Sequence, residues 1–113
     1  MKIFQGDVVY IKISESQFKK LVKETKNKPV KVEGSYVVVH GESGNTHRIV
    51  VEEPTKNKVE LLELGNGLFG LKVNGQAVIT HEKHLPEKTL GSGFYFVAQK
   101  TEYFPNEERL IKD

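Results

Sequence analysis

Short runs of branched and aromatic residues, separated by turn residues, recur along most of this chain, and such runs are typical of β-strands. Residues 8–13, which follow a Gly6-Asp7 turn, are mostly branched or aromatic and predict a largely buried strand. Residues 45–53 alternate regularly, so His47 shares a face with Ile49 and Val51. The pattern predicts strands at residues 8–13, 30–33, 36–40, 45–53, 59–64, 68–73, 76–80 and 93–99.

One stretch departs from this pattern of strands and turns and predicts a helix. Phe18, Leu21 and Val22 stand at i, i+3 and i+4, with lysine and glutamate around them. Ser14 or Ser16 is the expected N-cap. We therefore expect one short amphipathic helix within residues 14–26.

Lysines gather in and after this helix. They can form a phosphate-binding face or a solvated surface, and runs of charge usually have the second role. We expect the solvated face. The lysines concerned are Lys19, Lys20, Lys23, Lys26, Lys28 and Lys31.

Two Asn-Gly pairs between the predicted strands favour tight hairpins. Asn66-Gly67 and Asn74-Gly75 are both expected at hairpin tips, because Asn and Gly accept positive φ at little cost. Short strands with closely spaced turns indicate a mostly β fold. The prediction is a single domain over residues 1–113, a small β-barrel or two-sheet sandwich with one short α-helix near the N-terminus.

Composition narrows the classes of protein. The chain has 113 residues, with 37% hydrophobic and 28% charged side chains, as in a soluble globular protein. It has no cysteine, which excludes disulfides and thiolate metal sites. No apolar run is long enough for a membrane span, and the N-terminus does not resemble a signal peptide. We expect a cytoplasmic protein without a membrane partner.

A formal net charge of +2 does not by itself indicate nucleic-acid binding. The sequence identifies no partner, and an assembly of identical chains is compatible with it.

The candidate chemistry lies in three of the four histidines. His81, Glu82 and His84 follow the strand predicted at residues 76–80, and His47 lies on another strand. Imidazole is the commonest protein metal ligand, and nitrogen and oxygen donors suit zinc. We therefore expect a site for zinc or another divalent metal, or for another ligand, with these four residues as the donors. It requires a folded rim that joins the two segments.

Two other functions use the same residues. His47 and His81 can act as general base and acid, with Arg48 and Lys83 holding a phosphate, as metal-independent phosphodiester cleavage requires. The histidines can also be ordinary core or surface residues of a non-catalytic interaction module, in an oligomer or a phage-related assembly. Under that interpretation His47 simply packs among apolar neighbours.

The two histidine segments resemble a family of small uncharacterised bacterial and phage proteins. That family has a block Gly-Glu-x-Thr-Gly-His-x-His-Arg and a later Thr-His-Glu-Glu-His block, followed by an aromatic strand and a Gln-Arg-Glu-Tyr segment. The resemblance covers about residues 34–105 together with Gly6-Asp7. The matching residues are Gly41, Glu42, Gly44, His47, Arg48, Thr80, His81, Glu82, His84, Gly93, Tyr95, Gln99, Glu102 and Tyr103.

Three departures from the family pattern bear on the site. Asn45 stands where the family has the first histidine of its pair, Lys83 replaces a glutamate, and Thr101 interrupts the last segment. If the family site binds metal, the resemblance implies weaker binding or none here. The paired histidines are also similar to those of small cupin-like barrels, but the second cupin block is missing. The resemblance implies no activity.

Overall fold

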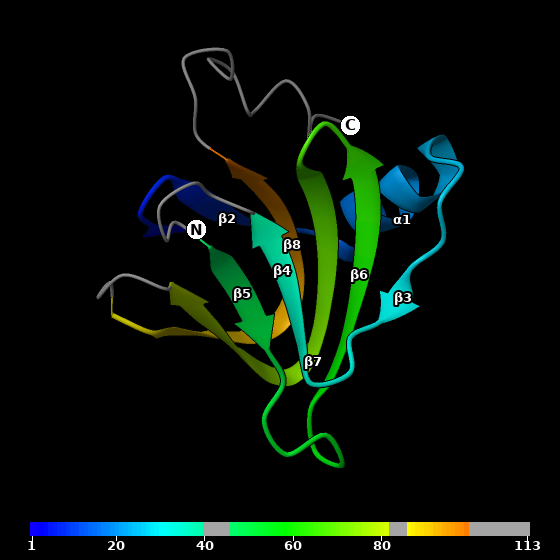
Figure 1. Cartoon of the computed structure of the whole chain (residues 1–113). Coiled ribbons are helices and arrows are strands. Elements are labelled where there is room, and N and C mark those ends of the chain that lie inside the picture. Colours follow the sequence, from blue (N-terminus) through cyan, green and yellow to red (C-terminus); the bar gives the residue numbers. More distant parts are fainter. Residues whose placement is uncertain (40–45, 82–85, 100–113) are drawn as a thin grey trace.

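All strands of the described chain belong to one antiparallel sheet (Figure 1). The structure is a computed structural model and describes residues 1–39, 46–81 and 86–99. Its elements are β1 (Lys2–Gln5), β2 (Val8–Ile13), α1 (Glu15–Glu24), β3 (Val30–Lys31), β4 (Ser35–Val39), β5 (His47–Val50), β6 (Lys58–Gly65), β7 (Leu68–His81) and β8 (Lys88–Gln99). The strand order is β1-β2-β8-β7-β5-β4, while β6 also pairs with β7 and β3 pairs with β6.

The long strand β7 organises this sheet. Its first half pairs with β6 as far as Asn74, its last residues pair with β5 from Val78, and β8 pairs with both halves. The ladder between β7 and β8 is interrupted between Val73 and Gln76. Gly75 and Gly93 have φ of 103° and 149° at this interruption, values that glycine adopts readily. Bulges of this kind bend strands, and both strands turn sharply in Figure 1.

This bend corrects one prediction from the sequence. Asn66-Gly67 is the tip of the β6–β7 hairpin, with Asn66 at φ 54°, as expected. Asn74-Gly75 is not a hairpin tip, because both residues lie inside β7. The pair lies at an irregularity within one strand and not at a turn between two strands. The predicted loop at residues 86–92 is also shorter than expected, since β8 begins at Lys88.

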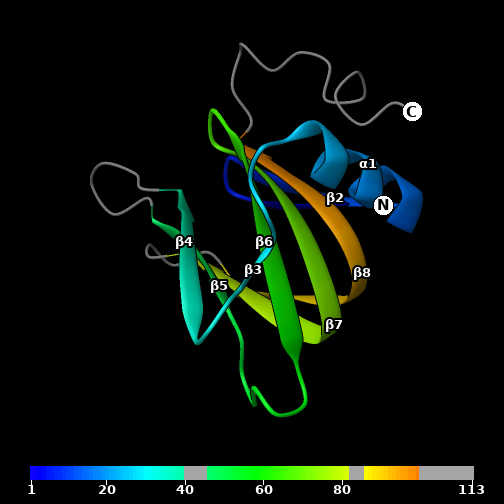
Figure 2. The ribbon, with the colours of Figure 1, turned by 90° about the vertical axis from the view of Figure 1, so that its right-hand side faces the viewer.

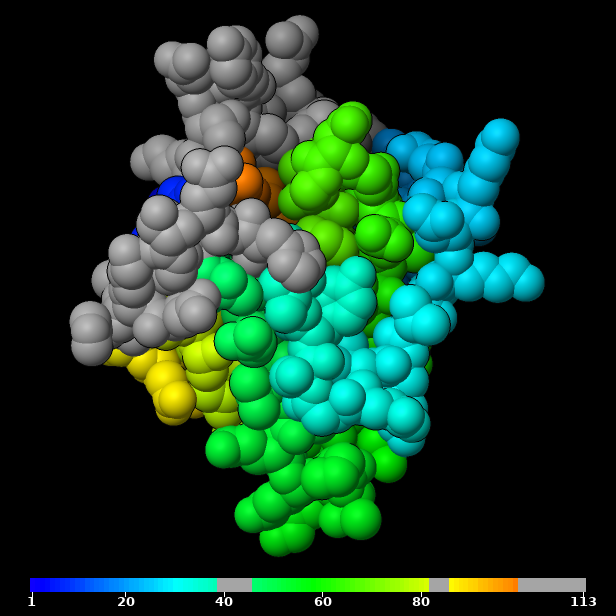
Figure 3. Space-filling view, viewed as in Figure 1, coloured from blue at the N-terminus to red at the C-terminus, as the bar shows by residue number. Residues whose placement is uncertain are grey.

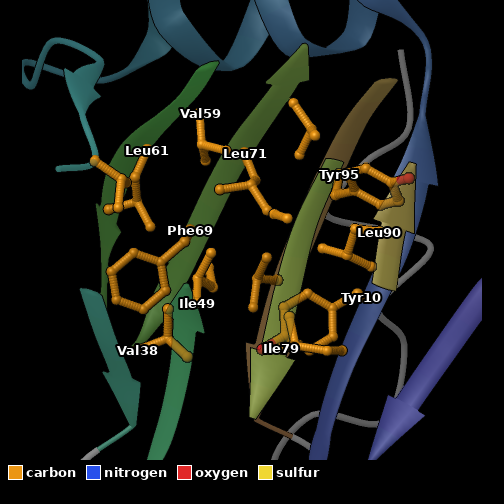
Figure 4. Close-up of a cluster of buried hydrophobic side chains, with 14 of the residues drawn as sticks. Tyr10, Val38, Ile49, Val59, Leu61, Phe69, Leu71, Ile79, Leu90 and Tyr95 are labelled. Carbon is orange, nitrogen blue, oxygen red and sulfur yellow. The ribbon is translucent and has the colours of Figure 1, made fainter. Parts of the chain in front are cut away.

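Folding the sheet over on itself encloses the main core. Side chains from β2, β4, β5, β6, β7 and β8 point into one interior (Figure 4). Ile49, Leu71, Ile79 and Leu90 are fully buried there. Alternation in residues 45–53 predicted the buried face of that strand, since His47, Ile49 and Val51 are all buried. The mostly β fold with one short helix is confirmed. The architecture is a single bent open sheet with its two halves facing each other.

Helix α1 covers the outer face of the sheet beside β7 and β8, and β4 lies on the other side of the molecule (Figure 2). Ser14 is the N-cap and forms a capping box with Gln17, which decides between the two expected serines. Phe18 is the buried anchor of α1, and its ring centroid lies 5.1 Å from that of Phe94, with the two rings tilted by 41°. The six lysines singled out in the sequence are exposed, as expected for a solvated face.

With ten residues, α1 is much shorter than the roughly twenty that cross a bilayer. None of the helices in the described ranges could therefore span a membrane.

Candidate functional site

Two of the predicted site histidines meet at the end of the β5–β7 ladder. His47 opens β5, His81 closes β7, and the two are direct cross-strand partners. Cross-strand partners project to the same side of a sheet. Their ring centroids are 4.5 Å apart, with an edge-to-face angle of 71°. The fold thus brings together two imidazoles that are far apart in the sequence.

A carboxylate from the β1–β2 turn orients the first of these rings. The Nε2 atom of His47 lies 3.1 Å from Oδ1 of Asp7. The other oxygen of Asp7, Oδ2, accepts a hydrogen bond of 2.7 Å from the side-chain amide of Gln99. A chain of polar contacts therefore runs from the end of β8 through Asp7 to His47.

Burial and these neighbours set the charges of the pair. Burial and the nearby His81 lower the pKa of His47, although Asp7 opposes them. Partial burial raises the pKa of Asp7, but hydrogen bonds from Gln99, from its own backbone amide and from His47 bring the pKa below its usual value. At neutral pH the contact therefore joins a neutral imidazole to a carboxylate.

The charges in turn fix the tautomer of His47. A carboxylate only accepts hydrogen bonds, so Nε2 of His47 carries the proton and donates it to Asp7. The Nδ1 atom then holds a lone pair. His47 is completely buried, and Nδ1 finds no hydrogen-bond partner in the described structure.

A second buried polar residue holds the turn that carries Asp7. Gln5 is 2% exposed, and its side-chain amide donates to the carbonyls of Ile79 and Pro86 at 2.9 and 3.0 Å. These bonds tie β1 to the end of β7 and the start of the next segment. Gln5 thereby keeps the Asp7 turn against the histidine strands.

Sequence reasoning identified His47 and His81 but missed their supports. Asp7 was visible only as a turn residue and, like Gln99, as part of the family resemblance. Nothing in the sequence marked Gln5 as a site residue. All three reach the histidines through pairing between distant strands. Gln5 lies in β1, a strand that the sequence pattern did not predict.

The other predicted residues are placed apart from the pair or are not described. Arg48 is exposed, next to the buried His47, and successive residues of a strand point to opposite faces. It therefore does not face the histidine pair. Glu82, Lys83 and His84 lie outside the described residues. Within the described ranges, no group of three or more His, Cys, Asp or Glu side chains is arranged to hold a metal.

Chemically, the pair offers the buried Nδ1 nitrogen of His47, which carries no proton, beside a second imidazole. A neutral imidazole with one nitrogen bound to a carboxylate has its other nitrogen available for a proton or a metal ion. Figure 3 shows the molecule from the side of Figure 1, where β4 (cyan) and the segment before β6 (green) lie at the surface.

Comparisons with known proteins place the chain in a family. No curated protein and no solved structure gave a match. A family profile described as "Domain of unknown function (DUF8820)" matches residues 4–100, a span that includes Gln5, Asp7 and both histidine strands. Because this match covers most of the sequence, the chain belongs to the family described as Domain of unknown function (DUF8820).

Proposed function

We propose that this protein binds a divalent metal ion, with zinc as the leading candidate, through His47 and His81. The observation that carries this proposal is the contact of the two imidazoles, one of which is oriented by a carboxylate. Zinc in proteins lies about 2.0–2.1 Å from each ligating nitrogen. A separation of 4.5 Å between the ring centroids is close enough for both imidazoles to bind one ion.

The Asp7 contact supports this proposal further. Histidines that bind metals commonly donate their other ring N–H to a carboxylate, which fixes the tautomer and raises the basicity of the ligating nitrogen. Asp7 makes this contact with Nε2 of His47, so Nδ1 is the atom that would bind the ion. Complete burial of the ring suits a ligand more than a group that meets bulk solvent.

Two imidazoles do not complete a zinc shell, which usually has four ligands. The sequence predicts Glu82 and His84 as further donors, one and three positions after His81 in the chain. In the bacterial and phage family that the sequence resembles, a histidine stands where this chain has Asn45. We therefore expect binding that is weaker than at a complete structural zinc site.

Zinc binding is measured by calorimetry and by metal analysis after dialysis. We expect His81→Gln to weaken binding strongly, and Asp7→Asn, which removes only the orienting charge, to weaken it by about 10–100-fold. His84→Gln tests the predicted third donor. His40→Gln, a histidine outside the proposed donor set, is the matched control. Equal zinc uptake by the wild type and His81→Gln would refute the proposal.

One observation also supports the acid–base alternative. The bond from His47 to Asp7 is of the kind that orients a catalytic histidine. The burial of His47 opposes this role, because a general base must reach its substrate. Hydrolysis of a simple phosphodiester that survives a chelator and is lost in His81→Gln would favour the alternative. A non-catalytic interaction module predicts neither metal uptake nor hydrolysis in these assays.

A further inference from the structure

The two Asn-Gly pairs of this chain lie in contrasting surroundings, and the contrast concerns a chemical modification. In such a pair the glycine nitrogen can attack the side-chain carbon Cγ of the asparagine. The new N–C bond closes a five-membered succinimide, and the amide nitrogen leaves as ammonia. Water then opens the ring at either carbonyl and leaves aspartate or isoaspartate. The reaction needs no partner except water.

Asn66 has the surroundings that this reaction needs. Asn66 and Gly67 are both exposed, at the tip of the hairpin that joins β6 to β7. In a two-residue hairpin loop the turn bond joins the flanking residues, here Gly65 and Leu68, and leaves the amide of Gly67 free. Within the described structure, neither the Asn66 side chain nor the Gly67 amide has a hydrogen-bond partner. A Cβ built on Gly67 would meet nothing within 4 Å, so no side chain crowds this residue.

Asn74 has the opposite surroundings. The amide of Gly75, which would be the attacking nitrogen, donates a hydrogen bond of 2.8 Å to Oγ of Ser92. The Ser92 hydroxyl donates back to the Gly75 carbonyl at 3.0 Å. Asn57 packs against Gly75 and accepts a bond from the next amide, that of Gln76. The nitrogen is therefore occupied and the backbone is held in place.

We propose that Asn66 is a site of spontaneous deamidation and that Ser92 protects Asn74 from the same reaction. The product carries a new carboxylate at the β6–β7 tip, which lowers the formal net charge from +2 by one. The isoaspartate form also adds a methylene to the backbone of a two-residue turn. Hairpin tips open more readily than strand interiors, which gives Asn66 the local freedom to close the ring.

Peptide mapping by mass spectrometry tests the proposal on the intact, folded protein after incubation in mildly alkaline buffer. We expect conversion at Asn66 at least about tenfold faster than at Asn74, as the hydrogen bonds that lock Gly75 imply. Treatment with an isoaspartyl methyltransferase identifies the isoaspartate product. A short peptide that contains Asn66-Gly67 gives the rate without the fold. Conversion of Asn74 at the rate of Asn66 would overturn the proposal, and so would an unreacted Asn66 when the peptide has fully converted.

The Ser92→Ala variant tests the protection separately. Ser92 is exposed, so its removal should leave the fold intact, which circular dichroism checks. We expect Asn74 to begin converting in this variant while the rate at Asn66 stays unchanged. Continued resistance of Asn74 would show that Ser92 is not its protector. Asn66→Ser is the control that removes the reactive amide at position 66. Asn74 should still convert only slowly in this variant.

Discussion

His47 is a buried ionisable side chain whose charge state depends on its neighbours. Burial lowers its pKa relative to the unfolded chain, so the folded protein takes up a proton at this ring less readily than the unfolded protein does. The stability that the neutral His47 ring contributes should therefore be fully present above the unfolded pKa of about 6.5. It should be lost as the pH drops below that value. The loss levels off once the pH is below the folded pKa.

Chemical denaturation across this pH range measures the effect. The wild type should lose stability on acidification, and His47→Gln should show a flatter profile between neutral and mildly acidic pH. Asp7 adds a second loss at lower pH, as the pH falls from about 3.9 through its lowered pKa. A wild-type profile that rises on acidification from neutral pH would contradict the assignment of His47 as a neutral buried ring.

Gly70 lies directly against the ring of Phe18, the buried anchor of α1. A Cβ at this position would lie 3.2 Å from Cε1 of Phe18 and 3.5 Å from Cβ of Leu62. Gly70→Ala should therefore push the Phe18 ring outward and destabilise the fold by about 1–3 kcal/mol, as overpacking usually does. Gly91→Ala is the matched control, because a Cβ there meets nothing within 4 Å. Its effect should stay within about 0.5 kcal/mol in thermal or urea unfolding.

The sequence showed part of the site at this scale, and the physical reason for the rest is clear. Alternation placed His47 on the inward face, because side-chain direction within one strand is a local property. The hydrogen bond to Asp7 is not local, since it depends on how β1 and β2 return to β5. Gln99 reaches the same carboxylate from the far end of the described chain. No pattern in one strand encodes such contacts.

At the scale of elements, α1 was predictable because its signals are contiguous. Its apolar spacing, capping serine and basic last turn all lie within a few residues. Ser14→Ala should cost about 0.5–2 kcal/mol, because the Ser14 side chain accepts from the Gln17 amide at the helix start. Ser16→Ala, two positions further on, should cost less than Ser14→Ala. Urea denaturation decides, and equal losses in the two variants would contradict the capping role.

The exposed lysines in and just after α1 lead to a separate prediction. If they form a solvated face, the double variant Lys23→Gln with Lys26→Gln should change stability by no more than about 0.5 kcal/mol. It should also leave zinc binding unchanged, since neither lysine lies in the histidine pair. Loss of nucleic-acid binding on this change, in a gel-shift assay with the wild type as reference, would support the phosphate-binding alternative.

The misplaced hairpin shows where reasoning by elements fails. Asn74-Gly75 has the composition of a hairpin tip, and Gly75 does have positive φ. The same backbone freedom also serves a bulge, and local sequence does not distinguish the two uses. Pairing with β8 on both sides of the irregularity keeps β7 one strand and makes Asn74-Gly75 a bulge. Partners beyond the segment thus decided its structure.

At the scale of the whole molecule, the bend at Gly75 places the two halves of the sheet face to face. A side chain at this position would overlap Asn57. The backbone there has a φ of 103°, which L-residues rarely adopt. Gly75→Ala should therefore destabilise the protein by about 2 kcal/mol or more, through strain and overlap together. Gly91→Ala again provides the comparison on the neighbouring strand. A Gly75→Ala variant as stable as Gly91→Ala would mean that the bend does not need this residue.

The sharing of β7 between the two halves of the sheet also has a consequence for the order of folding. The meander of β6, β7 and β8 is contiguous in sequence and closes short loops, whereas the pairing of Val8 with Gln99 joins the two ends of the described chain. Contacts between distant residues form late because the entropy of closing the loop opposes them. We expect the meander to be structured in the transition state and β1–β2 to dock last. The turn that bears Asp7 arrives with that last step, so the histidine site becomes complete only when folding is complete.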